Sequence, residues 1–113
     1  MENDRIQRLS GKIVEQIIEL LHDKVYKIIL YGSYARGDFD MESDFDVMIL
    51  LDCPREEVLA YRKGICKIAS RLSLEDEIEV SLRLLDRSTY EKWMDAVVFY
   101  QNVDREGVLL YGE

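Results

Sequence analysis

Histidine and cysteine are scarce in this chain, which has one histidine, His22, and two cysteines, Cys53 and Cys66. A single imidazole leaves little material for a multi-histidine metal site or for Ser-His-Asp catalysis. The two cysteines lack metal-ligand spacing, so we expect reduced, partly buried thiols and a cytoplasmic protein. We expect His22 at the end of a helix.

Basic residues are fewer than acidic ones. The chain has 15 Lys and Arg and 23 Asp and Glu, which give a formal net charge of -8. Nucleic-acid backbones are held by clusters of Lys and Arg, so this balance disfavours a nucleic-acid partner. A metal-bound triphosphate or a basic protein suits the charge better. No apolar run approaches the length of a membrane span, and the acidic, polar start is unlike a signal peptide.

The length of 113 residues predicts one domain over residues 1–113. The pattern of apolar residues predicts that helices and strands alternate in it. Apolar steps of three and four predict helices, and short β-rich or strictly alternating runs predict strands. We expect Asp86 or Ser88 to cap the last helical stretch. The order is that of an α/β (α+β) domain, a small mixed β-sheet flanked by helices. The expected helices are residues 4–22, 55–72 and 88–102 (in one or two pieces), with a turn at 33–37; the expected strands are 25–31, 45–51, 77–85 and 107–111.

A glycine and a serine after the first expected strand suit phosphate binding. Gly32 permits a tight turn and a close approach of the backbone to phosphate. Ser33 begins a helical turn, where N–H groups are unpaired, and its hydroxyl can donate to a phosphate oxygen. Arg36 can contact phosphate as well, or it can pair with Asp38 or Asp40 and hold the loop.

Three carboxylates suit a divalent metal. Asp44 and Asp46 open the second expected strand, so their side chains point the same way, and Mg²⁺ prefers such oxygen ligands. Asp46 stands in an otherwise apolar run, where an unpaired charge is costly, and this favours a bound partner or a metal over a solvated pair. The third strand supplies Glu79, with Glu77 on the same face as the fallback, to bind metal or deprotonate an acceptor hydroxyl. The turn and the carboxylates together predict chemistry on a nucleoside triphosphate with two Mg²⁺ ions.

The spacing of these residues resembles the polymerase-β-like nucleotidyltransferase superfamily: Gly32-Ser33, ten residues, then Asp44-Phe45-Asp46. The fuller string, Gly-Ser-x-Ala-Arg-Gly and then Ser-Asp-x-Asp, is similar to its small stand-alone branch, the minimal nucleotidyltransferases (MNT). The resemblance implies the nucleotidyltransferase fold and Mg²⁺-dependent transfer of a nucleoside monophosphate, with ATP as the expected substrate, to a hydroxyl. It also implies that the Gly-Ser pair binds phosphate and the Asp pair binds metal. Glu79 occupies the place of the third family carboxylate, usually Asp, and is one methylene longer.

Minimal nucleotidyltransferases are often paired with a small helical HEPN protein, as antitoxin and toxin, and some transfer AMP to a tyrosine of the toxin. The resemblance therefore implies a HEPN-type protein partner and a protein adenylyltransferase. One alternative is a non-catalytic antitoxin that masks its partner. Another is a transferase acting on a small molecule or on RNA, which the acidity and the short chain after Asp46 disfavour.

A dense aromatic and aliphatic stretch precedes the last expected strand. It either packs against the sheet or presents one side to a partner or to a second copy of the chain, and the sequence leaves both interpretations open. The stretch comprises Tyr90, Trp93, Val97, Val98, Phe99 and Tyr100.

Overall fold

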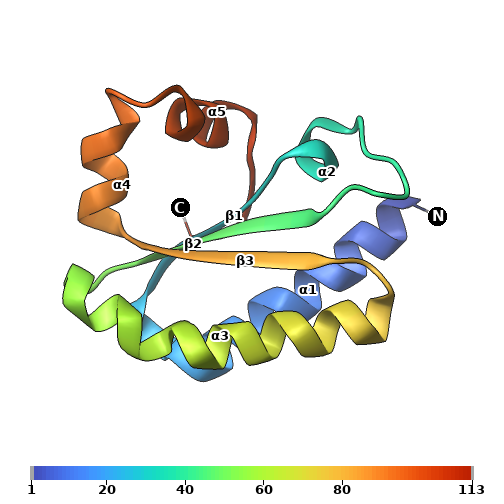
Figure 1. Ribbon diagram of the computed structural model, residues 1–113, viewed down its shortest axis with the longest axis horizontal. Helices are drawn as coiled ribbons and strands as arrows, with labels where there is room; N and C mark the ends of the chain where they lie inside the picture. The colour runs from blue at the N-terminus through green and yellow to red at the C-terminus, as the bar shows by residue number, and fades with distance from the viewer. Residues whose placement is uncertain (1, 113) are drawn as a thin grey trace.

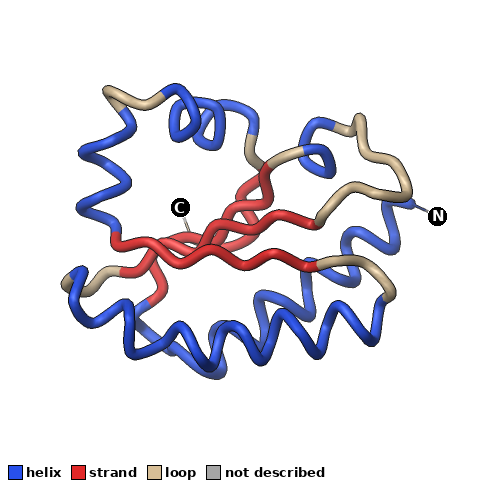
Figure 2. Tube along the Cα trace, in the orientation of Figure 1, coloured by secondary structure: helices blue, strands red, loops and turns tan. Residues whose placement is uncertain are grey.

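Four strands form one mixed sheet, as expected from the sequence (Figures 1 and 2). The order of the strands in the sheet is β3-β2-β1-β4. In the computed structural model, which describes residues 2–112, β1 (Val25–Tyr31) is antiparallel to β2 (Phe45–Leu51) and to β4 (Val108–Tyr111). The pair formed by β2 and β3 (Val80–Asp86) is parallel. β3 and β4 are therefore the two edges of the sheet.

Helices cover both faces of the sheet (Figure 1). The two long helices α1 (Glu2–Leu21) and α3 (Arg55–Asp76) pack on one face, on the lower side in Figure 1. The shorter α4 (Arg87–Met94) and α5 (Val98–Glu106) pack on the other. A 3-10 turn, η1 (His22–Lys24), follows α1, and the single-turn helix α2 (Ser33–Arg36) follows β1, as the sequence predicts.

The core has two layers because side chains alternate along each strand. Val47, Ile49 and Leu51 of β2 face the long helices, whereas Met48 and Leu50 face α4 and α5. All five are fully buried, which explains why the β2 sequence is almost continuously apolar. The packing of this central strand fixes the position of the residues at its start.

α3 is longer than its apolar repeat predicts, since it continues to Asp76 and β3 begins only at Val80. Glu77 ends the helix in a left-handed conformation with φ 55°. The Ser73 hydroxyl then joins helix and strand, accepting the Val80 N–H at 2.9 Å and donating to the Ala69 carbonyl at 2.7 Å. The expectation that Glu77 shares a strand face with Glu79 is therefore wrong.

Asp86 caps α4, and it is one of the two residues that the sequence predicts as the cap. Its carboxylate accepts the Thr89 N–H at 2.9 Å and is buried. Replacing Asp86 with Ala is expected to lower the free energy of unfolding by about 1 kcal/mol, because this N–H group loses its acceptor. Urea denaturation measures the loss. Asp86→Asn keeps a capping oxygen and should lose less, and equal losses in the two variants would contradict the capping role.

Part of the aromatic stretch packs against the sheet and part of it is exposed. Tyr90 is buried against the sheet, whereas Trp93, Val98 and Phe99 are exposed to 43%, 65% and 38%. Both cysteines are free; Cys53 is half-buried as expected, but Cys66 is exposed. Nowhere between residues 2 and 112 does a helix combine the length and apolarity needed to cross a membrane.

Candidate functional site

The turn after β1 is built on Gly32, which has φ 76° and ψ -155°. Its carbonyl accepts the N–H groups of Ala35 and Arg36, each at 3.1 Å, and so starts α2. Ser33 and Tyr34 belong to the first turn of this helix, where N–H groups have no intrahelical acceptor. The turn thus offers the backbone donors and the hydroxyl that the sequence suggests for a phosphate.

The Asp46 carboxylate lies directly against this turn. The antiparallel register pairs Tyr31, the last residue of β1, with Asp46, so the following Gly32 comes beside the carboxylate. A Cβ atom built on Gly32 would lie 2.6 Å from Asp46 Oδ2, a distance that real Cβ contacts do not reach. Gly32 is therefore required here for its conformation and for its lack of a side chain, and the candidate phosphate and metal groups are neighbours.

Asp44 and Glu79 meet at the starts of two parallel strands. The Phe45 N–H donates to the Glu79 carbonyl at 2.8 Å, and the register pairs Phe45 with Val80. A hydrogen bond with Asp44, together with its charge, raises the pKa of Glu79. Burial and then the charge of Asp44 raise the pKa of Asp46. Asp44 therefore disfavours ionisation of both neighbouring carboxyl groups.

These carboxylates fit a divalent cation that brings further ligands with it. Within the part of the chain that the structure describes, no group of three or more His, Cys, Asp or Glu side chains forms a ready metal cage. Mg²⁺ does not need one, because it keeps several waters and takes one or two carboxylates plus substrate phosphates. A cation beside Asp44 would relieve the effect of its charge on both neighbouring carboxyl groups. The residues present thus match half of a Mg²⁺ site, completed by a triphosphate.

Arg36 pairs with an aspartate of the loop, which is one of the two roles expected for it. Its Nε donates to Asp38 Oδ2 at 3.2 Å, and its guanidinium also donates to Ser33 Oγ at 3.4 Å. Further along, the Asp40 carboxylate accepts the Glu42 N–H at 2.9 Å and orders the approach to β2. The contact with Ser33 keeps the Arg36 charge at the candidate phosphate-binding turn.

Arg83 is a cation of this site that the sequence reasoning did not single out. Partners in a parallel pair point to the same face, so Ser81 opposite Asp46 and Arg83 opposite Met48 share the face of the carboxylates. The charge of Arg83 opposes the rise in the pKa of Asp46. Its guanidinium also lies 5.4 Å from the ring centre of Phe99 on α5. The alternation of Glu79, Ser81 and Arg83 along one face of the expected strand is the sequence signal that could have identified Arg83.

The chain is similar in sequence to a known protein family and to a named protein. Residues 11–102 match the nucleotidyltransferase domain family. A protein of Methanocaldococcus jannaschii named "Putative protein adenylyltransferase MJ0141" is 41% identical over 86 residues, which cover 76% of this chain and 85% of that protein.

Two solved structures share the fold. The crystal structure of a toxin-antitoxin with AMP-PNP aligns with a TM-score of 0.58 and 21% identity, covering 92% of this chain and 73% of that one. A tri-AMPylated Shewanella oneidensis HEPN toxin in complex with an MNT antitoxin aligns with a TM-score of 0.57 and 20% identity, covering 96% of this chain and 73% of that one.

Proposed function

We propose that this chain, which belongs to the nucleotidyltransferase domain family, transfers AMP from ATP to a hydroxyl group of a partner protein in a Mg²⁺-dependent reaction. The observation that carries the proposal is the contact between Gly32 and the Asp46 carboxylate. It puts candidate phosphate-binding groups beside candidate metal-binding groups, which is the arrangement that nucleotidyl transfer needs.

The names of similar proteins support AMP as the transferred group and a protein as the acceptor. The relative from M. jannaschii carries the name of a protein adenylyltransferase, and the S. oneidensis complex holds an AMPylated HEPN toxin. The other toxin-antitoxin structure contains AMP-PNP. By this likeness, the partner of the present chain would be a HEPN-type toxin and the chain its antitoxin.

The residues of the turn would hold the triphosphate. The Ser33 hydroxyl and the N–H groups of the first turn of α2 donate to phosphate oxygens, and Arg36 would exchange Asp38 for phosphate. Arg83 adds positive charge on the same face of the sheet. These groups position the α-phosphorus and spread the charge that develops on it.

The carboxylates would act on the acceptor side. Asp44, Asp46 and Glu79 would hold Mg²⁺, which when bound neutralises phosphate charge and favours ionisation of the acceptor hydroxyl. The acceptor oxygen forms a bond to the α-phosphorus, the bond to the bridging oxygen of the β-phosphate breaks, and pyrophosphate leaves. Glu79, like Asp44, is exposed beside the starts of the two parallel strands, which suits it to receive the hydroxyl proton.

Label transfer tests the proposal. The protein is incubated with [α-³²P]ATP, Mg²⁺ and the product of the adjacent gene, and the label is expected on that product. EDTA and the double change Asp44→Ala/Asp46→Ala should abolish it, and [γ-³²P]ATP should give none, which separates AMP transfer from phosphorylation. Absence of transfer, or unchanged transfer by the double variant, would contradict the proposal.

A masking antitoxin is the second candidate, favoured by the exposed Trp93, Val98 and Phe99. Such a surface can bury itself in a partner without any chemistry. Growth of cells that produce the toxin separates the two functions. Full protection by the Asp44→Ala/Asp46→Ala variant would favour masking, whereas lost protection would favour AMP transfer.

A further inference from the structure

The candidate site opens toward the face of the sheet that carries α4 and α5, on the upper side in Figure 1. Side chains alternate along β2, so Asp46 shares this face with Met48, whereas Phe45 points to the long helices and is fully buried. Tyr31 lies opposite Asp46 in the antiparallel register and shares its face. A nucleotide held by its phosphates at this end of the sheet would therefore extend its sugar and base on the side of α4 and α5.

Phe99 of α5 presents an aromatic ring on this face, next to side chains of the site. Its ring centre lies 5.7 Å from that of Tyr31, with 88° between the ring planes, and 5.4 Å from the Arg83 guanidinium. Burial raises the pKa of Tyr31, the positive charge of Arg83 opposes this rise, and the negative charge of Asp46 adds to it. The charge of Arg83 also lowers the pKa of Asp46 against the effect of burial. The Phe99 ring and the Asp46 carboxylate are therefore both near one arginine side chain.

An exposed aromatic ring beside a phosphate site suits a nucleobase, because bases stack on aromatic side chains. Phe99 is exposed to 38%, which leaves part of its ring open to a ligand. Two further aromatic side chains of residues 2–112 are exposed, Trp93 and Tyr111. The Trp93 ring lies beside Lys92 of its own helix, and Tyr111 is at the end of the edge strand β4. The ring contacts of Phe99 instead lead to β1 and β3, two of the strands that carry the site.

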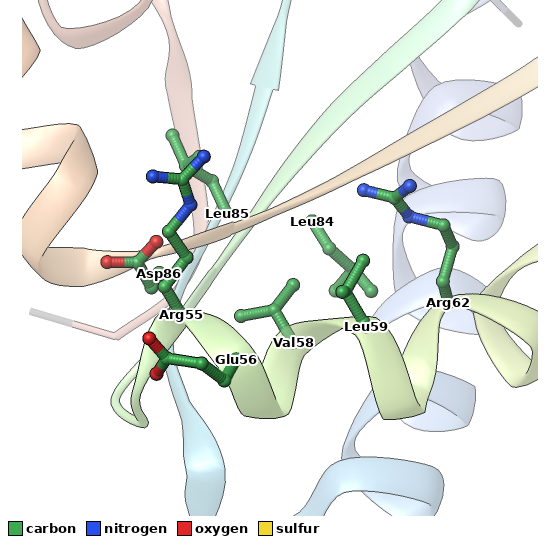
Figure 3. A pocket seen from close by; sticks show the side chains of 8 residues that line it. All are labelled: Arg55, Glu56, Val58, Leu59, Arg62, Leu84, Leu85 and Asp86. Carbon is green, nitrogen blue, oxygen red and sulfur yellow. The ribbon is translucent and has the colours of Figure 1, made fainter.

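The recess of about 420 Å³ between α3 and β3 offers a base no such ring (Figure 3). The apolar side chains that line it are aliphatic, and Figure 3 shows Leu59 and Leu84 between the guanidinium groups of Arg55 and Arg62. The recess also reaches Asp86, the last residue of β3, and so lies at the end of this strand that is farther from the candidate carboxylates. The nucleoside half of a bound nucleotide is therefore better placed at Phe99.

We propose that the ring of Phe99 is the stacking platform for the adenine base of ATP. Tyr31 supports the edge of this platform, and Arg83 stands between the base and the phosphates. This inference rests on the proposed function and adds a base-binding residue to it. Phe99 contacts the substrate away from the reacting phosphorus, so it contributes to the affinity for ATP and little to the rate of the chemical step.

Binding of two ligands that cannot react tests the platform by isothermal titration calorimetry in the presence of Mg²⁺. One ligand is α,β-methylene-ATP, which has the base but cannot transfer AMP, and the other is inorganic triphosphate, which has no base. Phe99→Leu is expected to weaken binding of α,β-methylene-ATP about tenfold, because the base loses its stacking partner. The same variant should bind inorganic triphosphate within about twofold of the wild type. Phe99→Tyr keeps the ring and should bind both ligands within about twofold of the wild type.

Tyr111→Leu is the matched control, since it removes an exposed aromatic ring from β4 rather than from α5. Its affinity for α,β-methylene-ATP should stay within about twofold of the wild type. Initial rates of label transfer give a second readout. Phe99→Leu should raise the KM for ATP about tenfold and change kcat less than about threefold. Thermal unfolding checks that each variant folds, and Phe99→Met replaces Phe99→Leu if the latter does not.

Unchanged affinity of Phe99→Leu for α,β-methylene-ATP would overturn the platform, as would an equal loss in Phe99→Tyr or in Tyr111→Leu. An equal loss of affinity for inorganic triphosphate would overturn it too, because the base would then not be the group that Phe99 holds. The two proposals fail separately. Ring-dependent binding of α,β-methylene-ATP without label transfer to any protein would overturn AMP transfer and leave the platform standing. Label transfer with an unchanged KM for ATP in Phe99→Leu would overturn the platform and leave AMP transfer standing.

Discussion

Replacing Asp44 with Asn is expected to lower the kcat of AMP transfer by about 10²–10³-fold, the cost of removing one electrostatic group from such a site. The charge of Asp44 acts on both Asp46 and Glu79, so we expect its neutralisation to weaken the proposed cation site more than neutralisation of either of those two residues. Because Asp44 is exposed and precedes β2, the fold should be retained. Initial rates with [α-³²P]ATP measure the activity, and thermal unfolding checks the fold.

Asp52→Asn is the matched control for this prediction. Asp52 follows the opposite end of the same strand, is exposed, and gives the same change in charge. Its kcat should change less than about twofold, since it lies outside the site. If both variants lose activity to a similar degree, net charge rather than the position of Asp44 would be responsible, and the assignment of Asp44 as a metal ligand would be wrong.

The strands that carry the site were predictable because their signal is local. Alternation and apolar runs fix β1 and β2, and their ends bring the Gly-Ser turn and the Asp pair to one end of the sheet. The end of α3 was not predictable, since helices usually end at Gly or Asn in the left-handed conformation and here Glu77 takes it. A non-glycine residue in that conformation costs about 1–2 kcal/mol, so packing outweighs the local preference.

The relation between the two strands that hold the carboxylates depends on register, which local patterns do not encode. The pairing of Phe45 with Val80 sets Glu79 beside Asp44, and a slip of one residue would turn Glu79 to the opposite face. The same register brings Arg83 toward Asp46. The sequence could therefore name the acidic residues, but it could not show that Asp44 joins them or that Arg83 accompanies them.

Replacing Gly32 with Ala is expected to disrupt the site in two ways. The residue has φ 76°, and its new Cβ would lie 2.6 Å from Asp46 Oδ2. The strained backbone and the contact together should lower the free energy of unfolding by about 1–3 kcal/mol. Because the carboxylate must move away from the turn, AMP transfer should fall by about 10²-fold. Urea denaturation and initial rates measure the two effects.

Gly37→Ala isolates the backbone strain from the contact with the carboxylate. Gly37 has φ 86° at the end of the same helical turn, but a Cβ there has nothing within 4 Å. It should lose about 1–2 kcal/mol of stability and keep AMP transfer within about threefold of the wild type. A difference in activity much larger than the difference in stability assigns the loss at Gly32 to the displaced Asp46. Parallel losses in the two variants would mean that the turn matters only for folding, and the contact between turn and carboxylate would then carry no function.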